Sequence, residues 1–466
     1  MEEKKKFRLG KPNTYVIVFC MICICALMTW IIPAGEYDRT KMETGREIIV
    51  DGSYHLVESH PVGPLGVFSA IEAGFVQTAD IIFFIIYAFS FVNMLMKTGA
   101  FDAVMGMVLR KTKRFNIQWL FVIIMVMFGI LGSTMGMAEE TYGMYPVFIG
   151  LAAALGYDAI VGASIVYIGV QTGFASATLN PFTVGVANQI SEITMSPMML
   201  AYRVFCFILF QGVAILYVWR YATKIKQDPT RSLLYGTEFE HMGSTKSQEE
   251  MERMPMTLRH KLCAIEFVVV IALLVWGVIA KGWYIDELAT LFLIAMVICG
   301  VIGGETPNGI AMNLIESAKA MMFGALIVGI SRAILVVLQN GCIIDTVLYG
   351  AATILQKSSG CINSALMVVV QNILNFFIPS GSGQASVSMP IMAPLADLVG
   401  VDRQVAVLAF SFGDGYSNMF WPTGVATATG LMGLPINKWY RWIAPLFGIF
   451  FVMELVLVMI ASFIPM

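Results

Sequence analysis

Three acidic residues lie inside long apolar stretches of the sequence, each beside a run of small polar residues. They are Glu139, Glu140 and Asp414. A carboxylate at membrane depth is costly, so such a residue is a candidate for binding a substrate or an ion. No cluster of Lys or Arg lies in the same segments, so the acids favour a substrate that carries positive charge, held by charge-assisted hydrogen bonds. Alternatively, one of them, Glu139 in particular, binds H⁺ or Na⁺ or caps the helix that it begins.

Hydroxyl and amide side chains gather near the same acids and at two further breaks in the apolar pattern. They are suited to binding a small zwitterion or dehydrated Na⁺, or to satisfying backbone groups that a broken helix frees. Together with the three acids, the candidate substrate-binding residues are Ser133, Thr134, Ser176, Thr178, Asn180, Ser380, Ser382, Gln384, Ser417, Asn418 and Thr423. Four of these are also candidate Na⁺ ligands: Ser176, Asn180, Ser417 and Asn418. We expect no cofactor beyond a coupling ion, Na⁺ or H⁺.

The composition predicts an all-α polytopic membrane protein. Hydrophobic residues make up 58% of the chain and charged residues only 13%, which is outside the range of soluble globular proteins. The expected partners are therefore the lipid bilayer and a small molecule, and no nucleic acid. The eight cysteines lie mostly in apolar runs without a Cys and His spacing typical of a metal site, so we expect them to pack as small apolar side chains.

Interruptions of the apolar runs predict two re-entrant hairpins and two broken helices. A helix of about 20 residues is needed to cross a bilayer, but the apolar run 365–378 is shorter and is followed by Pro379 and Ser-Gly-Ser-Gly-Gln at 380–384. The chain must turn back there, which is tolerated where protein or a water-filled cavity covers the backbone. The predicted hairpins are residues 117–156 and 362–400, and the predicted broken helices are residues 158–190 and 403–432. Asp158 and Asp402 are expected to cap the helices that follow the hairpins.

The two halves of the sequence repeat. The Gly-x-Asp of 156–158 recurs at 400–402, an offset of 244, and the Ser…Pro segment 176–181 recurs at 417–422, an offset of 241. The first hairpin follows two predicted crossings and the second follows seven, so the copies should face opposite sides of the membrane. Such inverted repeats are typical of secondary transporters with a site at the bilayer midplane. The predicted division is a first repeat at 1–222, a cytoplasmic linker at 223–262 and a second repeat at 263–466.

The distribution of positive charge predicts the orientation. Five Lys or Arg residues lie within residues 4–11, before the first apolar run, which by the positive-inside rule places the amino terminus in the cytoplasm. Nine predicted crossings then leave the carboxyl terminus outside. We expect a multi-pass protein of the inner (plasma) membrane.

Four segments resemble the YfcC branch of the DcuC-type C4-dicarboxylate anaerobic carriers: MGMAEE at 135–140, GFASATLNPF at 173–182, SGSGQA at 380–385 and FGDGYS at 412–417. The resemblance covers essentially the whole chain. It implies the ion-transporter superfamily fold, in which a transport domain of hairpins and broken helices slides like an elevator against a homodimeric scaffold. The parent name implies dicarboxylate exchange, whereas the YfcC branch is labelled by inference as basic amino-acid antiporters. Sodium-dicarboxylate relatives have Ser-Asn-Thr at both hairpin tips, and this chain has Gly-Ser-Thr at 132–134 and Ser-Gly-Ser at 380–382.

The leading hypothesis is a secondary active transporter of a cationic amino acid of the arginine or ornithine type, working by exchange or ion coupling. The first rival is a carrier of C4-dicarboxylates or other anionic metabolites. An intramembrane enzyme is disfavoured, since the sequence has no Gly-x-Gly-Asp pair or His-Glu-x-x-His motif, and a channel is disfavoured because no filter-like motif is visible.

Three further ionisable residues lie in apolar runs. Arg332, in the middle of its run, is expected to pair with an acid or with a substrate carboxylate. Glu266 and Arg203 lie near the ends of their runs, so we expect their side chains to reach the membrane interface.

Overall fold

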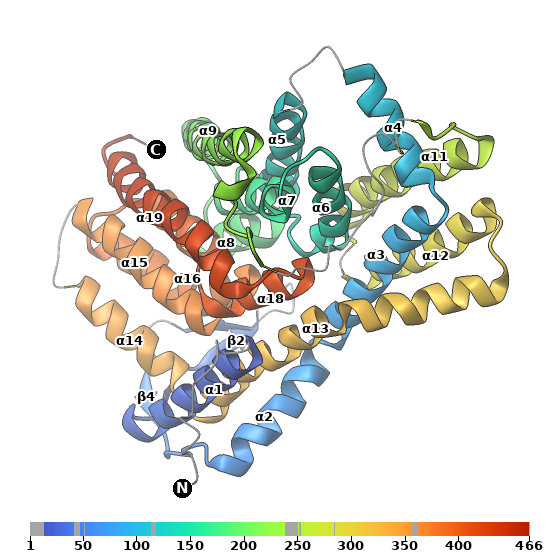
Figure 1. The fold of residues 1–466 in the computed structure, drawn as a ribbon. Coiled ribbons are helices and arrows are strands. Elements are labelled where there is room, and N and C mark those ends of the chain that lie inside the picture. The colour runs from blue at the N-terminus through green and yellow to red at the C-terminus, as the bar shows by residue number, and fades with distance from the viewer. Residues whose placement is uncertain are drawn as a thin grey trace, which may run out of the picture.

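The computed structural model describes residues 14–41, 47–50, 52–112, 118–237, 250, 253–283, 285–356 and 361–465. These residues are mostly helical (Figure 1). Seven of the described helices are long and apolar enough to cross a membrane: α1 (Thr14–Ile31), α3 (Ala79–Lys97), α5 (Gln118–Met135), α9 (Pro197–Gln227), α12 (Ile285–Gly303), α13 (Pro307–Asn340) and α19 (Ile436–Ala461). The expectation of a multi-pass helical membrane protein is therefore confirmed, while the number of crossings stays a prediction.

The longest helix, α13, begins at a defined cap and carries much of the packing. The Thr306 hydroxyl accepts a hydrogen bond from the N–H of Gly309, and Pro307 occupies the first turn, a combination that favours helix initiation. Its 34 residues span about 50 Å at 1.5 Å per residue, more than the roughly 30 Å hydrocarbon core. Figure 1 shows α13 alongside α1, α2 (Pro64–Gln77) and α18 (Pro422–Met432), and α3 packs on it as well.

Helices α5 and α6 (Tyr145–Ala154) both pack on α7 (Ala159–Ala175) and run in opposite directions. Residue 125 of α5 lies near residue 169 of α7, residue 129 near 173, and residue 132 near 170 to 174. Residue numbers rise together along both helices, so α5 and α7 run parallel. The order between α6 and α7 is opposite, with 149 near 162 and 145 near 167. Since α5 is parallel and α6 antiparallel to the same helix, the chain reverses between them, around residues 136–138.

The second half repeats this arrangement with α15 (Cys361–Phe377), α16 (Gly381–Leu398) and α17 (Arg403–Ser417). The start of α16 lies beside Asp414, near the end of α17, and Asp397 at the end of α16 pairs with Arg403 at the start of α17. Helices α16 and α17 are therefore antiparallel. Asn375, near the end of α15, bonds Asp414 as well, so the reversal at 378–380 lies at the same end of α17.

Helices α7 and α17 start in the same way, and each is followed by a break. Gly156 and Gly400 have φ of +77° and +72°, and the carboxylates of Asp158 and Asp402 accept hydrogen bonds from N–H groups in the first turn, which confirms the predicted caps. After α7 the chain leaves the helix for residues 176–180 and resumes as the short η2 (Pro181–Gly185) and α8 (Val186–Ile190). After α17 the corresponding break precedes α18.

The remaining elements lie outside these paired helices. Strands β1 (Gly35–Glu36) and β4 (His55–Leu56) pair, as do β2 (Arg39–Lys41) and β3 (Glu47–Ile49), so the all-α expectation is wrong for this short region. An ion pair of 2.9 Å between Arg39 and Asp345 joins the strands to α14 (Ile344–Leu355). The other described elements are α4 (Ala100–Thr112), η1 (Glu139–Met144), η3 (Pro229–Arg231), α11 (Leu258–Trp276) and η4 (Gly277–Lys281).

Several helices extend beyond the ranges that the sequence predicts. The apolar run 119–130 predicts a first hairpin arm that ends near Ile130. Helix α5 instead continues through Gly132 to Met135, because the missing side chain of Gly132 lets the helix pack directly against the backbone of α7. Helix α9 continues to Gln227, into the predicted linker, and α11 begins at Leu258, before the linker was expected to end. Residues 238–249 of that linker lie outside the described residues.

Candidate functional site

A cavity of about 220 Å³ lies where the two helix reversals meet the two helix breaks. Residues Gly136 and Glu139 come from the first reversal and Ser380 and Ser382 from the second, while Asn418 comes from the second break. Additional walls come from α3, α7 and α13; the lining residues from these three helices are Ile81, Tyr167, Gln171, Phe174, Val328, Ser331 and Arg332. Segments far apart in the sequence therefore converge on one cavity.

Two of the three predicted acids line this cavity. Glu139 and Glu140 both belong to η1, and the carboxylate of Glu140 accepts a hydrogen bond of 2.8 Å from the N–H of Ala138. That bond fixes Glu140 at the end of the reversal. Asp80, in the first turn of α3, interacts electrostatically with Glu139, so three carboxyl groups lie at or near this wall of the cavity.

Asp414 lies behind the second reversal rather than in the cavity wall. It is fully buried, and one carboxylate oxygen accepts a hydrogen bond of 2.9 Å from Asn375 Nδ2. Its other oxygen, Oδ2, has no hydrogen-bond partner among the described residues and would lie 3.2 Å from a Cβ added at Gly381. Asp414 therefore supports the tip from α17.

Arg332 is the positively charged residue among the described residues that line the cavity. Its Nε donates to Gln77 Oε1 at 3.0 Å, and Asp80 interacts with its charge. A second cavity of about 450 Å³, lined also by Arg39 and Asp345, shares Arg332, Ser380 and Ser382 with the first. The guanidinium and the second tip therefore lie between the two spaces.

Four predicted residues of the first half bond one another and the backbone instead of lining the cavity. The Ser133 hydroxyl donates to the carbonyl of Ser176 and exchanges a hydrogen bond with Thr178, each at 3.1 Å. Asn180 Oδ1 accepts from the N–H groups of Phe182 and Thr183. These side chains satisfy the backbone groups that the break at 176–180 frees, and they fasten α5 to that break. Their role as Na⁺ ligands stays a prediction.

The other predicted residues divide between the cavity and the helix backbone. Ser380 caps α16 by accepting from the N–H of Gly383, and Thr423 lines the cavity. Gln384 donates to the backbone and side-chain oxygens of Gln371. The remaining two hydroxyls return to carbonyls one turn earlier in their own helices: Thr134 to Ile130 and Ser417 to Gly413.

The cavity also contains aromatic residues that sequence reasoning missed. Tyr142, Tyr167, Phe174 and Phe182 line it. Aromatic faces attract cations such as guanidinium and ammonium groups. Aromatics are so frequent in this chain, at 12%, that only their position beside the polar breaks could have indicated these four.

Buried charges also differ from expectation. Arg203 was expected to reach the membrane interface, but it is 1% exposed and donates to the carbonyl of Ala177 in the first break at 2.9 Å, because that carbonyl is freed by the broken helix. The carboxylate oxygens of Glu266 are likewise buried, so the expectation for Glu266 is wrong too. Glu454, on α19, was not singled out and is fully buried.

A family model, two relatives and a solved structure were found to be similar to this chain. The model of the family described as DcuC, C4-dicarboxylate anaerobic carrier, matches residues 12–463. A protein of Escherichia coli K12 named "Putative basic amino acid antiporter YfcC" is 30% identical over 98% of this chain and 97% of its own length. An uncharacterized protein of Haemophilus influenzae Rd is 28% identical over 96% of each chain. The crystal structure of the Alcanivorax borkumensis YdaH transporter aligns with 96% of this chain and 98% of its own at a TM-score of 0.44 and 14% identity.

Proposed function

Because this chain belongs to the DcuC family of C4-dicarboxylate anaerobic carriers, it is a membrane transporter and not an enzyme, and we propose that it carries a small cationic amino acid of the arginine or ornithine type. Transport proceeds by exchange or by coupling to Na⁺ or H⁺. The observation that carries the proposal is the cavity that contains Glu139 and Glu140 beside the first helix reversal and Arg332 on α13. One space thus offers both negative and positive groups.

The cationic end of the substrate binds at the acidic wall. Two neighbouring carboxylates, with Asp80 acting on Glu139 from α3, supply charge-assisted acceptors for a guanidinium or ammonium group. The faces of nearby aromatic residues, Tyr142 and Phe174 among them, add cation–π attraction. A dicarboxylate would bring like charge to this wall. The E. coli relative is named a "putative basic amino acid antiporter", which points the same way.

The α-carboxylate of the substrate binds at Arg332 and at the start of α16. Helix α16 has 18 residues, and the free N–H groups at its amino end, with the positive end of its dipole, attract anions. Gly381 and Ser382, in its first turn, line the same cavity as Arg332. Residues carrying both signs of charge therefore suit an amino acid with one carboxylate and a charged side chain.

Movement of the substrate follows the elevator scheme that the family resemblance implies. The two halves form inverted repeats, the re-entrant hairpins and broken helices move together, and the scaffold is homodimeric. The amino terminus is cytoplasmic, the carboxyl terminus is external, and the protein resides in the inner membrane. The repeated order of paired helices, capped helix and break in the two halves supports this scheme.

A C4-dicarboxylate is the second candidate substrate. It is favoured by Arg332 in the cavity wall and by the family's description. A dicarboxylate would place one carboxylate on Arg332 and leave the other near Glu139 and Glu140, so it requires those acids to be protonated.

Competition experiments separate the two candidates. In proteoliposomes, uptake of labelled arginine should be inhibited by ornithine and unaffected by succinate. Glu140→Gln should lower the apparent affinity for arginine at least about tenfold, as expected for loss of one hydrogen bond to a charged group. Glu58→Gln, an exposed residue of the β4 region, is the matched control and should leave uptake unchanged. Inhibition by succinate instead of ornithine, with Glu140→Gln unaffected, would select the dicarboxylate.

A further inference from the structure

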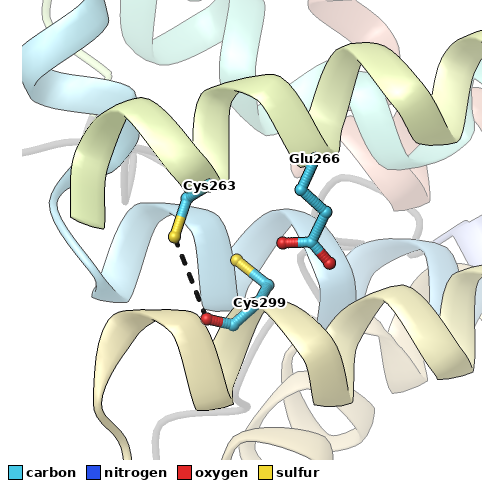
Figure 2. A group of neighbouring side chains, drawn as sticks. All are labelled: Cys263, Glu266 and Cys299. Atoms are coloured by element: carbon cyan, nitrogen blue, oxygen red, sulfur yellow. Dashed lines mark hydrogen bonds between the residues drawn. The ribbon is translucent and has the colours of Figure 1, made fainter. Parts of the chain in front are cut away.

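Two cysteines and a glutamate converge between α11 and α12, away from the cavity. Figure 2 shows Cys263 and Glu266 on one helix directed toward Cys299 on the other. The two Sγ atoms and a carboxylate oxygen of Glu266 all lie within 4.8 Å of one another. Both cysteines are fully buried. Residues three apart share a helix face, so α11 presents two of these groups together and α12 supplies the third.

These groups are the ones that bind zinc in proteins. Thiolate sulfur and carboxylate oxygen bind Zn²⁺ at about 2.3 Å and 2.0 to 2.2 Å, which sets neighbouring ligand atoms of a tetrahedral site roughly 3.6 to 3.8 Å apart. The observed spread of 4.8 Å or less closes to this value by small side-chain rotations. Two sulfur ligands favour Zn²⁺ over Mg²⁺ or Ca²⁺, which prefer oxygen alone.

The cluster leaves a polar group without a partner. Neither carboxylate oxygen of Glu266 has a hydrogen-bond partner among the described residues, although both are buried. Cys263 Sγ makes a weak, 3.9 Å hydrogen bond to the carbonyl of Cys299. A buried carboxylate is costly unless a cation or hydrogen-bond donors compensate it. A bound divalent cation would supply this compensation.

A positive charge lies one helical turn away. Arg259 precedes Cys263 by four residues on α11, and its Nη1 donates to the carbonyl of Gly303, four residues after Cys299 on α12, at 3.3 Å. Two thiolates and a carboxylate around Zn²⁺ carry one net negative charge. The guanidinium of Arg259 is placed to balance it.

We propose that Cys263, Glu266 and Cys299 form a Zn²⁺ site that joins α11 to α12, with a water molecule or an oxygen of the chain as fourth ligand. Binding converts the two thiols to thiolates and releases their protons to solvent. Since α12 packs along α3, which carries Asp80 and the start of the cavity wall, the metal would brace the scaffold on which the cavity depends. The site is independent of which substrate the protein carries.

Metal content and Co²⁺ spectroscopy test the site directly. Full-length protein purified in detergent under reducing conditions should contain about one Zn²⁺ per chain, and Co²⁺ added after chelation should produce a thiolate charge-transfer band that Zn²⁺ abolishes. Cys263→Ser and Cys299→Ser should weaken Zn²⁺ binding at least about tenfold, the range found for loss of even an outer-shell partner, and Glu266→Gln should shift the Co²⁺ spectrum. Cys206→Ser, which removes a fully buried cysteine of α9, is the matched control.

Three results would overturn the proposed Zn²⁺ site. No Zn²⁺ in the reduced wild-type protein and no Co²⁺ band would overturn the proposal, as would equal metal affinity in Cys263→Ser and Cys206→Ser. A disulfide between Cys263 and Cys299 that persists in protein purified under reducing conditions would also overturn it. Mass spectrometry would show this disulfide as a mass lower by two hydrogen atoms. If a variant fails to fold, the wild-type protein still decides: Zn²⁺ should raise its unfolding temperature after chelation, because a ligand of the folded state stabilises it.

Discussion

At the scale of residues, we expect the distribution of charge around one cavity to determine which substrate binds. Glu139 and Glu140 lie on η1 and Arg332 lies on α13, so the acidic and the basic side chains come from different elements. The acids could be predicted from the sequence, because a carboxylate in an apolar run requires an explanation. The aromatic lining could not, because an aromatic side chain in a membrane helix is ordinary. The sequence also could not show that Asp414 lies behind the tip, since a residue beside a break can face either way.

Substitution of Arg332 tests the carboxylate end of the proposed substrate. Arg332→Gln should raise the KM for arginine about 10- to 100-fold, the range expected for a hydrogen bond to a charged group, while Arg332→Lys should recover part of the affinity because it retains the charge. Agmatine, which lacks the α-carboxylate, should compete equally well in wild type and Arg332→Gln. Unchanged KM for arginine in Arg332→Gln would exclude contact between Arg332 and the substrate.

At the scale of elements, the sequence predicted interruptions better than lengths. The breaks at 176–180 and before Pro422 follow from Asn, Pro and small polar residues, which cannot continue a helix without freeing backbone groups. The 34 residues of α13 and the extension of α5 to Met135 could not be predicted, because glycines that look like breaks instead permit close helix contacts. The short strands between α1 and α2 were missed because two or three paired residues leave no periodic pattern.

The contact between α5 and α7 depends on a missing side chain. A Cβ at Gly173 would lie 2.0 Å from the carbonyl oxygen of Gly129, so Gly173→Ala must push the two helices apart, at a cost of about 1 to 3 kcal/mol. Gly212→Ala, on a glycine of α9 with open space around it, should be neutral or slightly stabilising. Thermal unfolding in detergent measures both. Equal unfolding temperatures for the two variants would contradict the close packing of α5 on α7.

At the scale of the whole molecule, the repeated halves provide the proposed moving unit and its support. Helix α18 follows the second break and packs against α13; in the elevator scheme α18 moves and α13 does not. The backbones of the two helices approach closely there, because Gly324 on α13 faces Gly430 and Leu431 on α18. The offsets between the halves predict an inverted repeat, and its details stay a prediction. The path of movement depends on contacts between distant segments, which no local pattern encodes.

A larger side chain at the contact between Gly324 and α18 should stop transport without preventing substrate binding. A Cβ at Gly324 would lie 2.7 Å from the backbone nitrogen of Leu431, so Gly324→Val should abolish arginine flux in proteoliposomes while equilibrium binding in detergent changes less than about threefold. Gly350→Val, at an exposed glycine of α14 with open space around it, should leave both unchanged. Normal flux in Gly324→Val would contradict sliding between α13 and α18.

Counterflow tests the central claim, transport of a cationic amino acid, most directly. Proteoliposomes are loaded with unlabelled arginine, or in parallel with succinate, and diluted into trace labelled arginine without any ion gradient. We expect transient accumulation of label in arginine-loaded vesicles, none in succinate-loaded vesicles, and loss of the signal in Glu140→Gln. Accumulation of labelled succinate in succinate-loaded vesicles, with no counterflow of arginine, would contradict it.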